Sequence, residues 1–499
     1  MGESGSGKTT LLNTLSGQRS RQMKVNGDIK INGMDLDVRS IAAYVEQNDL
    51  FIPTLTVYEH LMFTGTLVLG QKLSKSEIKE KVNEVIASFS LNTCRNTQIG
   101  CIEKGIGISG GQRRRLSIAS QIMANPRIIF LDEPTSGLDS HTAETGFTCP
   151  TNFNPADFFI ETIAVRHGKE KEHKEITQAS QDTGQVKTEL KAEVLFQSKQ
   201  GVSHVEFSKI EKKKMATVSA QFRSLLLRSW RSTVRNPVLF KMRVFQIIII
   251  SIIFGLIYLR LENSTENIYN FAGAMFGITS NTTFGGVMGV IFVIPAELAV
   301  FRREHSKGLY YTWIYFVTKT LVDIPVFTLM PSIMILITYF MIGFNQTVKS
   351  YFSFWLTLVL VSLVATSFGY LISALTSKYE TASALAAPLM IPFMIFGGFM
   401  IRTKNIPIYF AWISYISWFR YGFDVFVSSQ FTDTELICNS PVSFNCDSVR
   451  TVPGSAAIQA LGISDFGLTI NVVALLSLLV GFRILGLIAL EVKTRLNER

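Results

Sequence analysis

The chain has 499 residues, of which 47% are hydrophobic and only 17% carry a charged side chain. A soluble protein of this length is usually more charged and less apolar, so the composition argues against a purely soluble protein. The formal net charge is +10. Its basic residues gather beside long apolar segments, as at an inner-leaflet membrane surface, so this charge does not require a nucleic-acid partner.

The N-terminal residues match a pattern that binds nucleoside triphosphates. Residues 2–9 fit G-x-x-x-x-G-K-[ST] in full. The glycines let backbone N–H groups face a phosphate, and the positive end of the following helix adds to the attraction. Lys8 is expected to reach the β- and γ-phosphates. The ATP-binding candidates here are Gly2, Glu3, Ser4, Gly5, Ser6, Gly7, Lys8, Thr9 and Thr10.

Two further segments carry chemistry that phosphoryl transfer needs. Residues 127–133 form an apolar run that ends in Asp132 and Glu133, which predicts a buried strand of a parallel sheet with acids at its carboxyl edge. We expect Asp132 to bind Mg²⁺ and Glu133 to act as general base on the attacking water. Between these elements, residues 109–112 predict a helix N-terminus that binds an anion, followed by the basic turn 113–115.

These elements together resemble the nucleotide-binding domain of an ATP-binding cassette (ABC) transporter. Residues 2–9 are similar to Walker A, Gln47 to the Q-loop glutamine, residues 109–112 to the signature motif, 128–133 to Walker B and 136–139 to the D-loop. The resemblance implies ATP and Mg²⁺ as cofactors, with Thr9, Gln47 and Asp132 as metal ligands. It also implies a head-to-tail dimer in which the signature motif contacts the ATP of the other cassette. The remaining ATP-site candidates are Gln47, Ser109, Gly110, Gly111, Gln112 and Asp139.

The second half of the chain contains six apolar runs, each near the length of about 20 residues that a membrane span needs. They lie near residues 244–261, 271–294, 321–344, 354–376, 382–401 and 468–490. The chain is therefore predicted to combine a truncated α/β P-loop nucleotide-binding domain (1–165), a polar linker (166–215) and an all-α, six-helix transmembrane domain (216–499). A long outer loop is expected at about 402–466.

Basic residues precede the first apolar run and follow the second, fourth and sixth runs, which predicts a multi-pass membrane protein with both termini in the cytosol. The membrane is either the plasma membrane or that of an intracellular vesicle. Cys438 and Cys446 then face the oxidising side, where a disulfide is favoured over two free thiols. Asn263 and Asn345 are glycosylation candidates, whereas the sequon at Asn281 lies inside the second run and is interpreted as a chance match.

The order of the domains narrows the resemblance. A cassette followed by six spans is similar to the G subfamily of half-transporters, and several stretches resemble its branch of insect eye-pigment precursor transporters, including 132–140, 149–158 and 414–421. The resemblance implies an ATP-dependent half-transporter that moves small metabolites as a homodimer or as a heterodimer with another half-transporter. Residues 297–304 and the basic helix near 221–236 are similar to the segments that transmit cassette closure.

The chain also departs from this family. After Thr145 it lacks the segment that carries the switch histidine, and none of its six histidines follows an apolar strand downstream of Asp132. We also expect the domain to lack the strand before the phosphate loop. Losing a central strand removes ladder hydrogen bonds and apolar cover, at a cost above a domain's few kcal/mol of stability. The alternative function is therefore a non-hydrolysing or dominant-negative splice form that pairs with an intact half-transporter.

Overall fold

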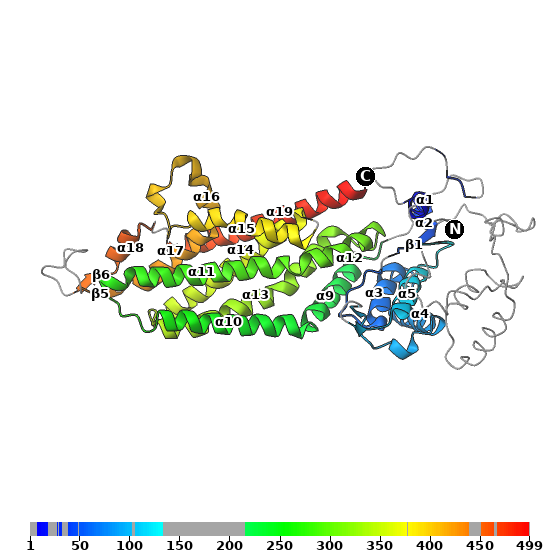
Figure 1. Cartoon of the computed structure of the whole chain (residues 1–499), viewed down its shortest axis with the longest axis horizontal. Helices are drawn as coiled ribbons and strands as arrows, with labels where there is room; N and C mark the ends of the chain where they lie inside the picture. The colour runs from blue at the N-terminus through cyan, green and yellow to red at the C-terminus, as the bar shows by residue number, and fades with distance from the viewer. Residues whose placement is uncertain are drawn as a thin grey trace, which may run out of the picture. The chain divides into compact units, whose positions relative to one another are not determined.

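A computed structural model describes residues 7–17, 27, 29–31, 38–47, 49–101, 105–132, 215–376, 378–438, 451–463 and 467–498. The elements are labelled along the chain in Figure 1. The chain forms two compact units. The first runs to Ser232 and includes Lys307–Tyr310, and the second consists of Thr233–Ser306 and Tyr311–Glu498.

The first unit contains a parallel pair of strands. Strand β1 (Ala42–Val45) lies beside β4 (Ile128–Leu131), with Val45 opposite Leu131. The strand predicted from the apolar run before Asp132 is thereby confirmed. All four residues of β4 are only half-buried, whereas strands of a parallel sheet are normally covered on both faces. A short antiparallel pair, β2 (Gly100–Cys101) and β3 (Ile106–Gly107), precedes the helix of the predicted signature motif.

Helices supply most of the apolar core of the first unit. They are α1 (Lys8–Leu15), α2 (Val38–Ile41), α3 (Val57–Leu69), α4 (Lys75–Ser88), α5 (Gly110–Ile122) and α9 (Val218–Val234), with the 3₁₀ turn η1 (Asn92–Cys94). Helices α3, α4 and α5 each begin with a capping box, in which a Ser or Thr and a Glu or Gln satisfy two backbone N–H groups. Leu61, Val82 and Leu116 are fully buried between these helices.

The second unit is almost entirely helical. Its helices are α10 (Pro237–Ile257), α11 (Ile268–Ile291), α12 (Ile294–Ser306), α13 (Thr312–Ile342), α14 (Val348–Leu375), α15 (Tyr379–Ile395), α16 (Ala411–Ile416), α17 (Trp418–Phe431), α18 (Ser455–Leu461) and α19 (Gly467–Glu498). Three 3₁₀ turns, η5 (Thr265–Asn267), η6 (Thr403–Asn405) and η7 (Ile408–Phe410), and the hairpin β5 (Glu435–Ile437) with β6 (Thr451–Pro453) complete it.

Helix α14 is the centre of this unit and packs against α11, α13, α17 and α19. Small residues allow α11 and α14 to approach closely. A Cβ at Gly369 would come within 3.0 Å of the Val287 carbonyl oxygen, and one at Gly286 within 3.2 Å of the Ser362 carbonyl oxygen. Small residues at helix contacts are typical of membrane proteins, where close packing takes over from the hydrophobic effect.

The apolar helices agree with five of the six predicted spans. Among the described residues, five helices are long and apolar enough to cross a membrane, and they overlap the first, second, third, fourth and sixth predicted runs. The fifth run, 382–401, is different: its helix α15 is shorter and ends at Ile395. Pro388 and Pro392 lie inside α15, and residues 396–401 after it are not helical, so the fifth predicted run is helical over only part of its length.

Two other segments differ from the sequence reading. The third predicted run starts near residue 321, whereas α13 is continuous from Thr312 and contains Asp323 and Pro325 in its interior. The predicted outer loop at 402–466 contains helix α17, whose Trp418 is fully buried. The charged and amide side chains of α17 lower its hydropathy, which hides its burial from a sequence reading.

Candidate functional site

The described part of the phosphate loop has the geometry that its sequence predicts. Gly7 adopts the left-handed conformation, with φ of 84°, and immediately precedes α1. A non-glycine residue would be strained at this φ. Thr9 and Thr10 are exposed in the first turn of the helix. The candidates Gly2, Glu3, Ser4, Gly5 and Ser6 and the side chain of Lys8 lie outside the described residues, so their predicted roles stay predictions.

Gln47 and Asp132 lie at the same edge of the β1–β4 pair. Asp132 directly follows β4, and its N–H donates to the Val45 carbonyl oxygen at 3.2 Å, while Gln47 follows β1 by two residues. Asp132 is buried, with 3% of its surface exposed. The parallel arrangement thus brings together two of the three predicted Mg²⁺ ligands. Glu133 and Asp139 lie outside the described residues.

Tyr44 is a neighbour of Asp132 that the sequence reading missed. Its hydroxyl donates to Asp132 Oδ2 at 3.4 Å. Burial, together with the charge of Asp132, raises the pKa of Tyr44 to about 12, so the phenol keeps its proton at neutral pH. The alternation of side chains along β1 gives no indication of this contact, because it depends on the pairing of β1 with β4.

The predicted signature motif forms an exposed helix N-terminus. Ser109 caps α5: its Oγ accepts from the Gln112 N–H at 3.3 Å, and Gln112 Oε1 accepts from the Ser109 N–H at 3.0 Å. Ser109 is exposed. The hydroxyl hydrogen of Ser109 remains able to donate, because this capping contact uses the oxygen as an acceptor. Helix α5 therefore offers a hydroxyl donor and the positive end of its dipole.

The arginines after the signature motif do not form the predicted basic turn toward an anion. The side chains of Arg113 and Arg114 are buried. Arg113 Nη2 donates to the Gly100 carbonyl oxygen at 2.6 Å, and burial lowers its pKa. Arg114 points to Asp132 and the Q-loop. The prediction of a basic first turn is wrong for these two residues, because the face of α5 that carries them packs against the rest of the first unit.

The oxygen donors suit magnesium. A hydroxyl from Thr9, an amide oxygen from Gln47 and a carboxylate from Asp132 are hard ligands of the kind that Mg²⁺ prefers. Within the described ranges, no group of three or more His, Cys, Asp or Glu side chains is close enough to hold a metal ion by itself. Magnesium is usually held by one or two carboxylates together with substrate phosphates, so this donor set fits the expected ATP–Mg²⁺ complex.

Helix α9, which contains the basic segment near 221–236, packs on α3 within the first unit. The Arg228 guanidinium lies over the Phe63 ring at 4.1 Å and over the Tyr310 ring at 5.7 Å. Arg231 forms an ion pair with Glu59 at 3.2 Å. Tyr310 is fully buried and ends the short connection Lys307–Tyr310 between α12 and α13.

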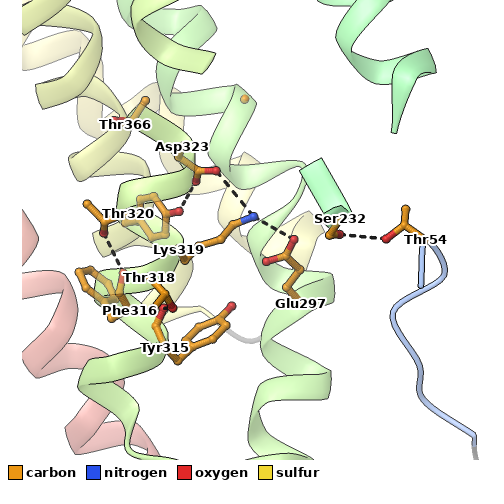
Figure 2. A network of polar contacts seen from close by, with 12 residues as sticks. Thr54, Ser232, Glu297, Tyr315, Phe316, Thr318, Lys319, Thr320, Asp323 and Thr366 are labelled. Atoms are coloured by element: carbon orange, nitrogen blue, oxygen red, sulfur yellow. Dashed lines mark hydrogen bonds and ion pairs between the residues drawn. The ribbon is translucent and has the colours of Figure 1, made fainter. Parts of the chain in front are cut away.

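Figure 2 shows a charged network among the helices of the second unit. It also shows the contact of Thr54 with Ser232 at 3.1 Å, which lies inside the first unit. Lys319 Nζ lies 3.0 Å from Glu297 Oε1 and 3.7 Å from Asp323 Oδ1. The Tyr370 hydroxyl donates to Asp323 Oδ2, and the Arg483 guanidinium stacks on Tyr370 at 4.3 Å. The network joins α12, α13, α14 and α19. Charged residues inside apolar runs were the signal that could have revealed it.

A second polar cluster involves both glycosylation candidates. Gln430, which is fully buried on α17, accepts from the Asn345 N–H at 2.9 Å and donates to Asn263 Oδ1 at 3.2 Å. Asn345 Nδ2 donates to Thr434 Oγ1 at 3.3 Å. Cys438 is disulfide-bonded. Its predicted partner, Cys446, lies outside the described residues, so the pairing stays a prediction.

Comparison with known proteins gives the class of this fold and site. The family model described as "ABC transporter" matches residues 1–136, and that described as "ABC-2 type transporter" matches residues 220–431. The chain is thus an ABC transporter, with an ATP-binding domain followed by a multi-pass membrane domain, as predicted.

Individual relatives narrow the class. The white protein of Drosophila melanogaster is 33% identical over 564 aligned residues, which cover 100% of this chain and 81% of that protein. The Caenorhabditis elegans ABC transporter ATP-binding protein/permease wht-1 is 28% identical, covering 100% and 85% of the two chains. Rat ABCG2, a broad substrate specificity ATP-binding cassette transporter, is 27% identical, covering 97% and 86%. The chain belongs to the G subfamily of ABC half-transporters, with the white-type proteins among its relatives, and its family function is ATP-driven membrane transport.

Proposed function

We propose that the chain is one half of a dimeric transporter that uses ATP to move small, flat metabolites of the pigment-precursor type. The observation that carries this proposal is the exposed, capped N-terminus of α5 at Ser109. This N-terminus presents a hydroxyl donor and a helix dipole to an anion. A phosphate bound by a second cassette is the ligand that the family arrangement supplies for it.

The residues of each site divide the work. Lys8 and the loop amides hold the phosphates, Thr9, Gln47 and Asp132 bind the metal, and Glu133 accepts a proton from the attacking water. When bound, ATP would supply the phosphoanhydride bond whose hydrolysis drives transport, and Mg²⁺ would neutralise charge on its phosphates. Tyr44 supports this arrangement, since its hydroxyl holds one oxygen of Asp132 and leaves the other to face the metal.

The contacts of α9 support a route by which cassette motion leaves the first unit. Arg228 lies between Phe63 of α3 and Tyr310, and Arg231 pairs with Glu59 of the same helix. The chain continues from α9 into α10 and from Tyr310 into α13. Movement of α3 is therefore expected to act on the start of two membrane helices. The basic residues beside the spans support a cytosolic position for this unit.

The alternative is a non-hydrolysing chain that pairs with an intact half-transporter. Three observations favour it. No histidine occupies the position of the γ-phosphate switch. The match to the white protein extends over 564 aligned residues, more than the 499 of this chain, so that relative has residues without a counterpart here. Strand β4 is only half-buried, which is expected if a neighbouring strand is missing.

Vanadate-sensitive ATPase activity of the purified chain in lipid tests both forms of the proposal. It is measured alone and with a full-length relative, with Glu133→Gln as the control. Activity of the chain alone that is lost in Glu133→Gln supports the hydrolysing half-transporter. No activity alone, with altered activity of the partner, supports the modulating half. No effect in either arrangement contradicts both.

A further inference from the structure

We propose that Arg114 is a positioning residue for the magnesium site: its guanidinium fixes the Q-loop and the backbone carbonyl of Asp132 in one arrangement and attaches both to the signature helix. This inference rests on the proposed nucleotide site. It assigns no contact of Arg114 with ATP or metal, because the side chain acts through the backbone of the residues that make those contacts.

One buried guanidinium joins three segments that are far apart in the sequence. Arg114 lies on α5, and its side chain is 2% exposed. Its Nη1 donates to the Glu46 carbonyl oxygen at 2.6 Å and lies 3.3 Å from Asp49 Oδ1. Its Nη2 donates to the Asp132 carbonyl oxygen at 2.6 Å. Glu46 and Asp49 are on either side of Gln47 along the chain.

Each carbonyl belongs to a peptide unit that orients a candidate site residue. The Glu46 carbonyl is part of the peptide bond to Gln47. The Asp132 carbonyl is part of the peptide bond from Asp132, which carries the expected metal-binding carboxylate, to the next residue in the sequence, Glu133. A peptide unit is planar, so holding its oxygen fixes the direction in which both neighbouring residues leave it. Arg114 therefore constrains the amide ligand and the carboxylate ligand together.

The geometry requires arginine. Its guanidinium is planar and rigid and carries five N–H donors, so one side chain reaches two separate carbonyls and a carboxylate. Lysine keeps the charge but concentrates it on one flexible nitrogen, which cannot hold both carbonyls in the same directions. Supporting residues of this kind typically change metal affinity by about 10–100-fold when they are replaced.

The neighbouring Arg113 provides a matched control. It lies on the same helix, is also buried, and also donates to a backbone carbonyl at 2.6 Å. Its acceptors, however, are the carbonyls of Ile99 and Gly100, which belong to the β2 region. Replacing Arg113 with lysine thus perturbs the packing of α5 to a similar degree without touching the backbone of Gln47 or Asp132.

The test measures nucleotide binding separately from hydrolysis. The full chain in lipid nanodiscs is titrated with a fluorescent ATP analogue, first in EDTA and then at fixed analogue with increasing Mg²⁺. We expect Arg114→Lys to raise the Mg²⁺ concentration for half-maximal effect by about tenfold. We expect the Mg²⁺-free affinity, which depends on the phosphate loop, and the melting temperature to stay close to wild type. Arg113→Lys should leave the Mg²⁺ midpoint unchanged.

Several results would overturn the inference. One is an equal shift of the Mg²⁺ midpoint in the two lysine variants, and another is an unchanged midpoint in Arg114→Lys. A parallel loss of Mg²⁺-free binding and thermal stability in Arg114→Lys would assign the residue a merely structural role. A wild-type chain that binds nucleotide with the expected Mg²⁺ response but does not hydrolyse it contradicts only the hydrolysing form of the function. A wild-type chain that binds no nucleotide overturns both.

Discussion

Replacement of Lys319 by methionine is expected to destabilise the membrane unit strongly. The Lys319 side chain is only 4% exposed and lies 3.0 Å from Glu297 and 3.7 Å from Asp323. At an effective dielectric constant near 20, each attraction amounts to about 4.5–5.5 kcal/mol before desolvation is subtracted. Methionine fills a similar volume but leaves two carboxylates without their shared cation. Breaking a buried pair in this way costs about 3–5 kcal/mol.

The size of the loss can be read as a melting temperature. For a unit of about 250 residues, 1 kcal/mol corresponds to about 2–4 °C, so Lys319→Met should lower the apparent Tm by about 6–20 °C in detergent or nanodiscs. The double variants Lys319→Met/Glu297→Gln and Lys319→Met/Asp323→Asn restore charge balance and should recover part of this loss. Lys349→Met, at an exposed position of α14, is the control and should melt like wild type.

Two results would refute this reasoning. If Lys319→Met melts like Lys349→Met, the three charges do not depend on one another. If both double variants melt below the single variant, the loss comes from packing or from hydrogen bonds and not from unbalanced charge. The double variants test the effect of unbalanced charge because Glu297 and Asp323 are changed to the isosteric amides, which keep the shape of the site.

Three further predictions concern other parts of the chain. Of the two glycosylation candidates, Asn263 should carry a glycan more readily than Asn345. Asn263 contacts Gln430 through its oxygen, whereas Asn345 donates from the nitrogen that a glycan would occupy. Deglycosylation of the Asn263→Gln and Asn345→Gln variants decides this. Maleimide labelling of Cys438 should require prior reduction, and Cys438→Ser should lower the stability of the outer region by about 2 kcal/mol, measured as a fall in Tm. Because its folded pKa is raised from 10.0 to about 12, Tyr44 contributes stability that is complete below pH 10 and is lost as the pH rises to about 12, so Tyr44→Phe should flatten the Tm profile in that window.

Local sequence signals were sufficient where a single element determines the structure. The pattern Ser-x-x-Gln at Ser109 satisfies its own helix N-terminus, so the start of α5 could be predicted from four residues. The run that ends at Leu131 is strongly apolar, and it forms the predicted strand. The long apolar helices were predictable for the same reason, since their burial in a membrane requires only length and hydropathy.

The remaining features depend on partners from other elements. Nothing around Arg114 in the sequence indicates that it turns inward, because its acceptors come from the loops after β1 and β4. The start of α13 was placed too late because Lys319 counts as polar in a hydropathy reading, although it pairs with Glu297 and Asp323 in the fold. Trp418 begins a buried helix that the reading treated as loop, since Arg420 and Asp424 reduce its apolar character.

The N-terminal part of helix α5 has two sides with different surroundings: an exposed cap at Ser109 and, about one turn further on, the buried guanidinium of Arg114. In the proposed pair of half-transporters, the Ser109 cap would face the partner's nucleotide, and Arg114 would support the chain's own site. Pairing with an intact relative would then make two unequal sites, and only the one built on this chain's phosphate loop lacks a switch histidine. The other would draw its whole hydrolytic apparatus from the relative and only its cap from this chain. Such a pair would hydrolyse ATP at one site, while the site that lacks the switch histidine would not hydrolyse it.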